Sequence, residues 1–283
     1  MSATRTLTST LPKASILDNL ELSIALRFAK DLARESGVIM KRYFQATDIG
    51  IEWKEDNSPV TVADRTINDL VIEKIKVTYP EYGVVGEEAS YKADRETVWV
   101  VDPIDGTAPF SFGMPISTFC LALVHNGDVQ VSVVYDPFQD RMYSAQVGLG
   151  AYMNDVRLHV SDASTLKKQY ILAFRSLTKP NHTGINTMFD AIQREGAKTY
   201  MFASFSYAGA LVADSRFVAA CMEYGSPWDA AAISLIVSES GGMATDLNGK
   251  PRKYNIWADG LILSNGKVHQ KLVDLIDYEN TRD

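Results

Sequence analysis

The sequence predicts a mixed α and β protein, with an α+β first half and an α/β second half. Two observations lead to this expectation. Early in the chain, two segments with helical spacing are followed by a series of apolar, β-branched runs that lack it. From residue 161 onward, short apolar runs alternate with helical segments, which is the pattern of a second α/β layer. We therefore expect an N-terminal half over residues 1–160, a C-terminal half over residues 161–283, and a site between them.

The composition excludes several classes of protein. With 283 residues, 46% of them hydrophobic, the chain can bury a sizeable core. A formal net charge of −7 and a pI near 5.2 argue against nucleic-acid binding through a basic surface. No apolar run approaches the ~18 residues of a membrane span, so no membrane association is expected. Residues 1–13 lack the apolar core of a signal peptide and are expected to form a disordered tail. Cys120 and Cys221 lie in apolar segments, which favours buried free thiols in a cytoplasmic protein.

Two amphipathic helices are expected before residue 80. Apolar side chains recur at three- and four-residue spacing over residues 16–44 and again over residues 61–79, where Pro80 ends the second helix. Thr61 or Asp64 would cap its start, because such side chains accept hydrogen bonds from free helical N–H groups. From the local sequence alone, capping is the favoured explanation for Asp64.

The rest of the first half predicts a mostly antiparallel sheet. Asn126 and Gly127 stand between two apolar runs, the strongest short-range hairpin signal. The strands expected in this half are residues 49–53, 82–85, 98–101, 117–125, 128–135, 141–146 and 151–153. Two helices packed on this sheet would make the first half an α+β unit.

The second half is expected to alternate between strands and helices. The expected strands are residues 170–174, 199–202, 216–222, 243–246 and 260–264. The expected helices are residues 184–194, 207–213, 228–240 and 268–278. We find no internal repeat.

The stretch around residue 100 contains candidate catalytic or metal-binding carboxylates. The apolar run 98–101 is typical of a buried strand, and it is interrupted at Asp102 and Pro103. Asp105 and Gly106 then turn the chain again. Two carboxylates would thus lie on a tight loop at the carboxyl end of a strand, where α/β proteins tend to bind ligands.

A second acidic turn precedes this strand, at Gly86, Glu87 and Glu88. Four carboxylates close to one strand repel each other unless a cation lies among them. Because no Cys or His lies nearby to offer soft ligands, a hard cation such as Mg²⁺ is the expected partner.

Three chemistries use clustered acids. The first is metal-assisted phosphoryl hydrolysis, in which the amides of a short helix after Gly106 would suit a phosphate. The second is an aspartyl-phosphate enzyme, but the Asp-x-Asp-Gly-Thr loop of haloacid-dehalogenase-type phosphatases is one residue shorter and normally follows the first strand. The third is a calcium-binding module, although the EF-hand spacing is absent. The four histidines are scattered, so neither a zinc site nor a Ser-His-Asp triad is supported.

Candidates in the second half are fewer. Asp229 stands in the first turn of the helix expected over residues 228–240, where an acid is ordinary helix-dipole chemistry. Glu223, at the end of a strand, is equally compatible with a solvated edge position.

An ordered set of motifs resembles the inositol monophosphatase family. Any one motif alone is weak evidence for the family, but the ordered set is highly specific and extends over about residues 29–277. The matching segments are Lys54, residues 58–61, residues 63–64, residues 86–88, residues 99–107, residues 227–229 and residues 240–242.

The resemblance implies a Mg²⁺-dependent, lithium-sensitive phosphatase that acts on a small phosphate ester. It implies a layered αβαβα sandwich of the sugar-phosphatase type, usually assembled as a homodimer, with two or three metal ions. By position in the family motifs, the implied metal ligands are Glu87, Asp102, the carbonyl of Ile104, Asp105 and Asp229.

The resemblance also implies roles in the chemical step. Asp64, hydrogen-bonded to Thr107, would polarise the nucleophilic water together with Glu87. The amides of Gly106 and Thr107 would hold the phosphate. Lys54 occupies the position of the family's mobile-loop lysine. Glu88 would be a nearby charge that a third, weaker metal could recruit.

The chain departs from the family where the alcohol would bind. Pro109 replaces a common asparagine, and residues 203–206, including Ser204, replace the stretch that helps to hold inositol hydroxyls. Glu223 approximates the substrate-contacting glutamate only if one gap is allowed; otherwise Met222 takes its place. We therefore take Ser204 and Glu223 as the candidate substrate-binding residues. We favour an inositol-1-monophosphatase-like activity on a small polyol phosphate. A substrate such as histidinol phosphate, a sugar phosphate or a phosphoadenosine nucleotide stays open. The alternative of a different class is a catalytically idle scaffold that binds metal or phosphate.

Overall fold

The computed structural model describes residues 17–44, 46, 50–55, 58–174, 183–223, 225–257 and 260–280. The expected tail over residues 1–13 lies outside these residues. None of the helices in the described ranges is long and apolar enough to cross a membrane.

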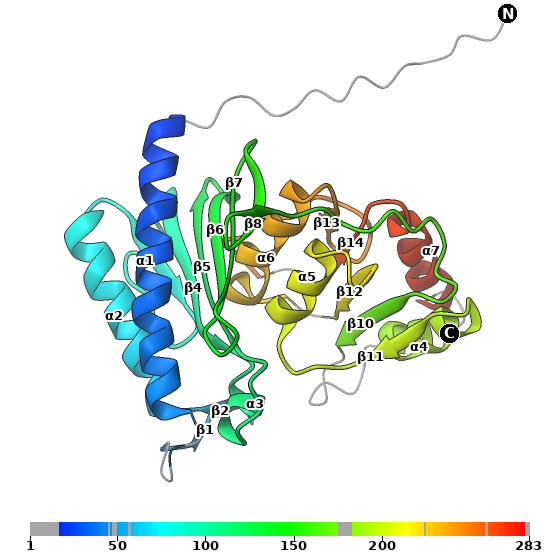
Figure 1. Ribbon diagram of the computed structural model, residues 1–283, viewed down its shortest axis with the longest axis horizontal. Helices are drawn as coiled ribbons and strands as arrows, with labels where there is room; N and C mark the ends of the chain where they lie inside the picture. Colours follow the sequence, from blue (N-terminus) through cyan, green and yellow to red (C-terminus); the bar gives the residue numbers. More distant parts are fainter. Residues whose placement is uncertain are drawn as a thin grey trace, which may run out of the picture.

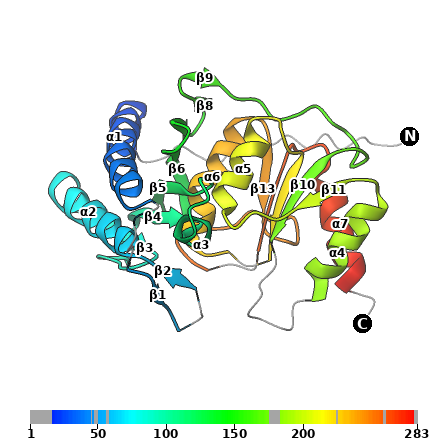
Figure 2. The ribbon, with the colours of Figure 1, turned by 60° about the horizontal axis from the view of Figure 1, so that its bottom comes forward.

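The elements form five layers in the order α, β, α, β, α (Figures 1 and 2). Helices α1 and α2 cover the outer face of a seven-stranded sheet, α5 and α6 lie between this sheet and a five-stranded sheet, and α4 and α7 cover the outer face of the latter. The helices are α1 Asn19–Tyr43, α2 Val62–Thr78, α3 Thr107–Ser111, α4 Thr183–Arg194, α5 Phe205–Ala213, α6 Pro227–Glu239 and α7 His269–Asn280. The layered αβαβα arrangement expected from the sequence is confirmed.

The first sheet is almost entirely antiparallel. Its order is β3-β4-β5-β6-β7-β8-β9, and only β3 and β4 run parallel. Asn126 and Gly127 both have positive φ, 50° and 82°, as a two-residue hairpin turn requires. The strands are β3 Gly83–Gly86, β4 Thr97–Asp105, β5 Thr118–His125, β6 Asp128–Asp136, β7 Arg141–Gln146, β8 Gly150–Met153 and β9 Val156–Arg157.

The second sheet is mixed. Its order is β11-β10-β12-β14-β13, with β10 parallel to both of its neighbours and β14 antiparallel to both of its own. The strands are β10 Tyr170–Phe174, β11 Lys198–Tyr200, β12 Ala219–Met222, β13 Met243–Thr245 and β14 Leu261–Ser264. A separate hairpin, β1 Glu52–Trp53 with β2 Pro59–Val60, precedes α2.

Local signals explain the long first helix. The side chain of Asp18 accepts hydrogen bonds from the N–H groups of Leu20 and Glu21, and the carboxylate of Glu21 accepts from the N–H of Asp18. Gly37 lies where α1 approaches the sheet, and a Cβ there would stand 2.5 Å from the ring of Tyr135. The glycine therefore allows the close packing of α1 on β6.

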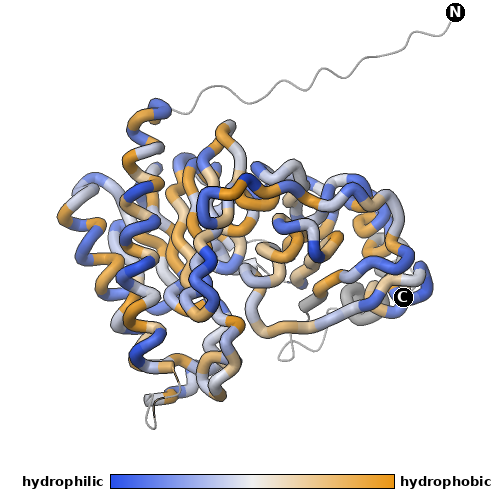
Figure 3. The backbone as a smooth tube through the Cα atoms, viewed as in Figure 1, coloured by the Kyte–Doolittle hydropathy of each residue, from blue (hydrophilic) through white to orange (hydrophobic). Residues whose placement is uncertain are grey.

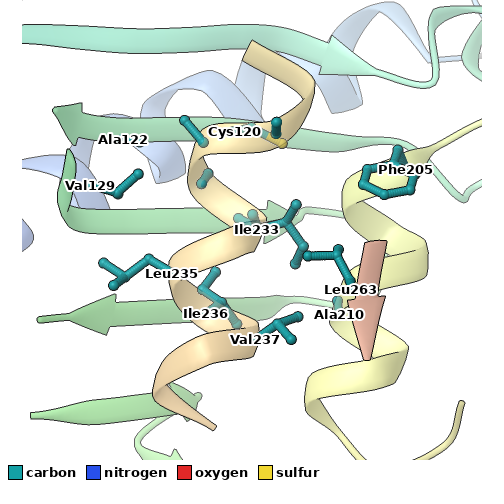
Figure 4. Close-up of a cluster of buried hydrophobic side chains, with 14 of the residues drawn as sticks. Cys120, Ala122, Val129, Phe205, Ala210, Ile233, Leu235, Ile236, Val237 and Leu263 are labelled. Atoms are coloured by element: carbon teal, nitrogen blue, oxygen red, sulfur yellow. The ribbon is translucent and has the colours of Figure 1, made fainter. Parts of the chain in front are cut away.

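The largest core cluster joins the two sheets through the middle layer. It includes β-sheet residues such as Cys120 and Ala122, helix residues such as Ile233 and Ile236, and Leu263 of the second sheet (Figure 4). Eight consecutive residues of α6, Ala230 to Val237, are buried because the helix lies between the two sheets, in the interior where much of the tube in Figure 3 is orange. Cys120 and Cys221 are free and buried, as expected.

Several expected boundaries were wrong. The strand near residue 100 does not end at Asp102 and Pro103, because β4 continues to Asp105 through a register shift that accommodates the proline. The expected strand 49–53 is reduced, among described residues, to the exposed pair in β1. Strand 216–222 begins only at Ala219, strand 199–202 is replaced by β11, and β2 and β9 were not expected.

Candidate active site

Parallel pairing of β3 and β4 brings the first acids together. Glu87 directly follows β3, and its N–H donates to the carbonyl of Val101, the residue before Asp102 (3.3 Å). Because the carboxyl ends of parallel neighbours meet at one edge of a sheet, Glu87 and Asp102 lie at the same edge.

Asp105 is fixed by the start of α5. Its carboxylate accepts hydrogen bonds from the Ser204 hydroxyl (2.9 Å) and from the N–H groups of Phe205 (3.1 Å) and Ser206 (2.5 Å). These N–H groups belong to the first turn of a helix, where an anion is favoured. The second half of the chain therefore determines where this first-half carboxylate lies.

Asp229 completes a cluster of three carboxylates. It lies in the first turn of α6, which starts with Pro227. One carboxylate oxygen each from Asp102, Asp105 and Asp229 lies within 4.8 Å of the other two. Asp102 and Asp105 are buried, with 1% and 6% of their surface exposed, and Asp229 is half-buried.

Burial and mutual repulsion shape the ionisation of the cluster. Burial, followed by the charges of Glu87 and Asp105, raises the pKa of Asp102 well above its usual range. Burial also raises the pKa of Asp105, although its three hydrogen bonds oppose the shift. Burial and the charge of Asp105 raise the pKa of Asp229 to about 8. Three oxygen donors that are costly to ionise together fit a hard divalent cation such as Mg²⁺.

Glu87 and Glu88 have a different partner. The ammonium of Lys54, in the β1–β2 hairpin, donates to Glu87 Oε1 (2.8 Å) and Glu88 Oε1 (2.5 Å). Burial would lower the pKa of Lys54, but the two glutamates together raise it above its ordinary value. Burial raises the pKa of Glu88, and Lys54 opposes that shift.

Asp64 and Thr107 meet beside the acids. Asp64 is fully buried; its Oδ2 accepts from the N–H (2.8 Å) and hydroxyl (2.5 Å) of Thr61, which caps α2. Its Oδ1 accepts from the hydroxyl of Thr107 (3.1 Å), which also lies 3.0 Å from the carbonyl of Ile104. Burial raises the pKa of Asp64 to about 6, despite the bonds from Thr61. Asp64 thus belongs both to the capping interaction and to the site.

Gly106 turns the chain from β4 into the short helix α3. Its φ of 91° is a conformation that favours glycine, and a Cβ would lie 3.0 Å from both the carbonyl of Ala203 and the Cβ of Ser204. Ser117 donates to its carbonyl (2.8 Å). Pro109 lies in the first turn of α3, where its missing N–H costs little.

The two candidate substrate-binding residues differ in what the structure shows. Ser204 is completely buried, and its hydroxyl donates to Asp105 and accepts from the N–H of Tyr207 (3.2 Å). The structure therefore assigns it to supporting Asp105. Glu223 follows β12 and is 7% exposed.

Sequence reasoning missed three groups near the acids. The N–H of Ser206 and the hydroxyl of Ser117 could be suspected only from their closeness to a helix start and a glycine turn. Arg252 is buried and donates to the carbonyls of Gly260 (3.0 Å) and Gly225 (3.1 Å). Its charge favours the ionised form of Asp229, and no sequence signal indicated it.

Comparisons with known proteins agree with this geometry. The profile of the inositol monophosphatase family matches residues 21–279. A histidinol-phosphatase from Chlorobaculum parvum is 33% identical over 260 residues, covering 89% of this chain and 96% of the relative. A fructose-1,6-bisphosphatase/inositol-1-monophosphatase from Thermotoga maritima is 30% identical over 254 residues, covering 89% and 95%. The structure of a T. maritima IMPase superimposes with a TM-score of 0.83 at 27% identity, covering 91% and 98%.

The fold and the acidic cluster define a phosphatase of the layered αβαβα class. The chain belongs to the inositol monophosphatase family, whose members are phosphomonoester hydrolases. The family resemblance seen in the sequence is thereby confirmed.

Proposed function

We propose that this protein is a Mg²⁺-dependent phosphomonoesterase that releases phosphate from a small polyol phosphate, in the manner of an inositol-1-monophosphatase. The observation that carries the proposal is the buried cluster of Asp102, Asp105 and Asp229 next to the Asp64–Thr107 pair. The three carboxylates form no ion pair with a side chain of the described residues, so they suit a divalent ion, and the buried carboxylate and hydroxyl of Asp64 and Thr107 suit proton transfer.

The metal ligands in this proposal are Asp102, Asp105, Asp229, Glu87 and the carbonyl of Ile104. Bound Mg²⁺ would supply Lewis-acid chemistry, neutralising phosphate charge and favouring ionisation of a nearby water. We propose two or three such ions. Glu87 would have to exchange its contact with Lys54 for a metal contact.

The chain's own residues would handle the water and the phosphate. Asp64, through the hydroxyl of Thr107, and Glu87 would orient the attacking water and accept its proton. The N–H groups of Gly106 and Thr107 would hold the phosphate oxygens. The water oxygen would form a bond to phosphorus as the ester bond breaks, and the departing alcohol oxygen would take up a proton. Asp64, with its pKa near 6, would be a base only above that pH.

The identity of the alcohol is the open part of the proposal. Ser204 is used to hold Asp105, so Glu223 is the proposed contact to a substrate hydroxyl. Histidinol phosphate is the second candidate, because a histidinol-phosphatase matches nearly the whole chain at 33% identity. We also propose inhibition by Li⁺, a homodimer and a cytoplasmic location, on the basis of the family resemblance and the composition.

Phosphate release from a panel of esters tests the proposal. The panel contains inositol phosphates, histidinol phosphate, fructose 1,6-bisphosphate, phosphoadenosine phosphate and glycerol phosphates, each with Mg²⁺, with EDTA and with added Li⁺. We expect one ester to be strongly preferred and its hydrolysis to require Mg²⁺. If none were hydrolysed by folded, Mg²⁺-loaded protein, the catalytically idle scaffold would replace this proposal.

A further inference from the structure

A cavity lies apart from the acidic cluster. It has a volume of about 340 Å³ and lies between the first half of α1 and strands β7 and β8. None of its lining residues comes from α2, β3, β4, α3 or α6, the elements that bear or precede the catalytic acids. In Figure 1 the first half of α1 and β7 lie at the top of the molecule, whereas α3 lies at the bottom. This cavity therefore belongs to a different region of the surface.

One wall of the cavity carries a cation, the ammonium of Lys30, whose ion pair in the described structure is a weak one. The side chain of Lys30 lines the cavity and is 23% exposed. Its ion-pair partner, Asp155, has a side chain that is 94% exposed, and the Nζ–Oδ1 distance of 3.6 Å is too long for a good hydrogen bond. An ammonium has three N–H donors, so Lys30 can still bind an anion in the cavity.

The opposite wall carries buried polar groups. Ser144, in β7, lines the cavity and is only 2% exposed. Beside it, the Ser23 hydroxyl lies 2.8 Å from the carbonyl of Asn19 and 3.1 Å from Oε1 of Gln146, and Nε2 of Gln146 reaches the carbonyl of Asn19 at only 3.4 Å. Hydroxyl and amide side chains both donate and accept hydrogen bonds, so this wall suits a ligand that carries hydroxyl groups.

The remaining lining limits the size and kind of ligand. Leu26, Leu149 and the ring of Tyr152 supply apolar surface beside the polar wall. The volume is in the range of small-molecule sites. Leu149 is 48% exposed, so a side chain of the lining is accessible from solvent.

We propose that this cavity is a second binding site, for a small organic anion that carries hydroxyl groups. Its carboxylate or phosphate contacts the ammonium of Lys30, and its hydroxyls contact Ser144 and the Ser23–Gln146 pair. The site is independent of the proposed phosphatase reaction, because it shares no residue with the acids and requires no metal.

Ligand titration of the full-length protein in EDTA tests the proposal, since without metal the acids offer no site for an anion. The probes are gluconate for a carboxylate, glycerol 3-phosphate for a phosphate, and neutral inositol. Their binding is measured by calorimetry and by saturation-transfer NMR. We expect at least one anion to bind with a Kd of about 1 mM or lower, and inositol to bind about tenfold more weakly or not at all. The anion that binds identifies the charged group that the site accepts.

Variants locate the binding. Lys30→Met, on the surface of α1, should weaken anion binding by about tenfold or more, the factor typical of a charged hydrogen bond. Ser144→Ala removes one hydroxyl and should weaken binding about threefold to tenfold. Lys41→Met, which changes an exposed lysine in the last turn of the same helix, is the matched control and should bind like the parent.

Two results would overturn the proposal. One is the absence of binding for both anions up to about 10 mM, far above the affinity expected of a formed site. The other is anion binding that Lys30→Met and Lys41→Met leave equally unchanged while both variants remain folded by circular dichroism. Neither result would affect the proposed phosphatase activity, which is measured with Mg²⁺ at the other site.

Discussion

The candidate active site contains two groups of carboxylates that differ in how their charge is balanced. Glu87 and Glu88 lie around the ammonium of Lys54, which the chain itself supplies. Among the described residues, no ion pair is formed with Asp102, Asp105 or Asp229; only the charge of Arg252 favours an ionised carboxylate there, that of Asp229, and the pKa of each aspartate is still raised. The difference supports the proposal of an added cation at the three aspartates, whereas Lys54 already balances charge at the glutamate pair.

Asp102→Asn tests the aspartate cluster most severely. The amide removes one charge from the centre of the cluster but keeps an oxygen that can accept from the N–H of Ile104. We expect turnover to fall by about three orders of magnitude or more, because the variant loses metal charge stabilisation. Steady-state kinetics across a Mg²⁺ series measures the effect. Activity within about tenfold of the parent at saturating Mg²⁺ would contradict the metal assignment.

Thr107→Ala separates proton handling from metal binding. Loss of the hydroxyl that bonds to Asp64 should slow turnover by about 10²-fold, the usual scale of general acid–base catalysis. Mg²⁺ affinity, measured by calorimetry, should change little. Thr107→Ser keeps the hydroxyl and should recover most of the activity. If Thr107→Ala abolished Mg²⁺ binding, Thr107 would be a ligand or a structural residue instead.

Lys54→Met tests whether the glutamate pair competes with the metal. Removing the ammonium frees Glu87 and takes a positive charge away from the site. The Mg²⁺ concentration for half-maximal activity should therefore fall by about threefold to tenfold, the effect of one partly buried ion pair. Lys74→Met, which breaks an exposed ion pair between Lys74 of α2 and Glu35 of α1, is the control and should leave this concentration unchanged. A higher Mg²⁺ requirement in Lys54→Met would show that Lys54 assists metal binding.

The smallest expected effect is on stability. Folding raises the pKa of Asp64 to about 6 and of Asp229 to about 8, above the ~3.9 of an unfolded chain. Between the unfolded pKa of ~3.9 and the folded pKa of each aspartate, the folded protein holds more protons than the unfolded chain. The free energy of unfolding therefore falls as the pH rises through this range. In EDTA, the Tm should therefore decrease from pH ~5 to pH ~8. The Tm of Asp229→Asn should decrease less over this pH range, and Mg²⁺ should make the Tm of the parent less dependent on pH. An equal dependence of Tm on pH in all three samples would contradict the raised pKa of Asp229.

The acids of the candidate site differ in how far the sequence could predict their positions. Asp102 and Asp105 are neighbours in sequence, and Glu87 follows the adjacent strand, so local patterns were sufficient to bring them together. Asp229 stood out only through its match to the family motif, because its helix start is ordinary by itself. The hydrogen bonds of Ser204 and Ser206 to Asp105 depend on where α5 packs, which no local pattern encodes.

The missed boundaries have a related cause. Pro103 normally interrupts a strand, but the register shift between Asp102 and Asp105 lets β4 continue beside β5. The hairpin that holds Lys54 was expected as one strand and a loop, because Pro59 and Val60 give too short a run to be recognised. The interpretation was therefore most accurate for long periodic segments such as α1 and α2, and least accurate at short segments fixed by tertiary contacts.

The position of α6 has a consequence for synthesis of the chain. The helix covers the inner face of the first sheet, yet it begins at Pro227, well after β7 ends at Gln146. A ribosome therefore releases the strands of this sheet before the helix that shields them. During that interval Cys120, Ala122 and their apolar neighbours are exposed to solvent and to other nascent chains. Expression conditions that slow elongation through residues 147–226 should lengthen this vulnerable stage, whereas chaperones that bind apolar strands should protect it.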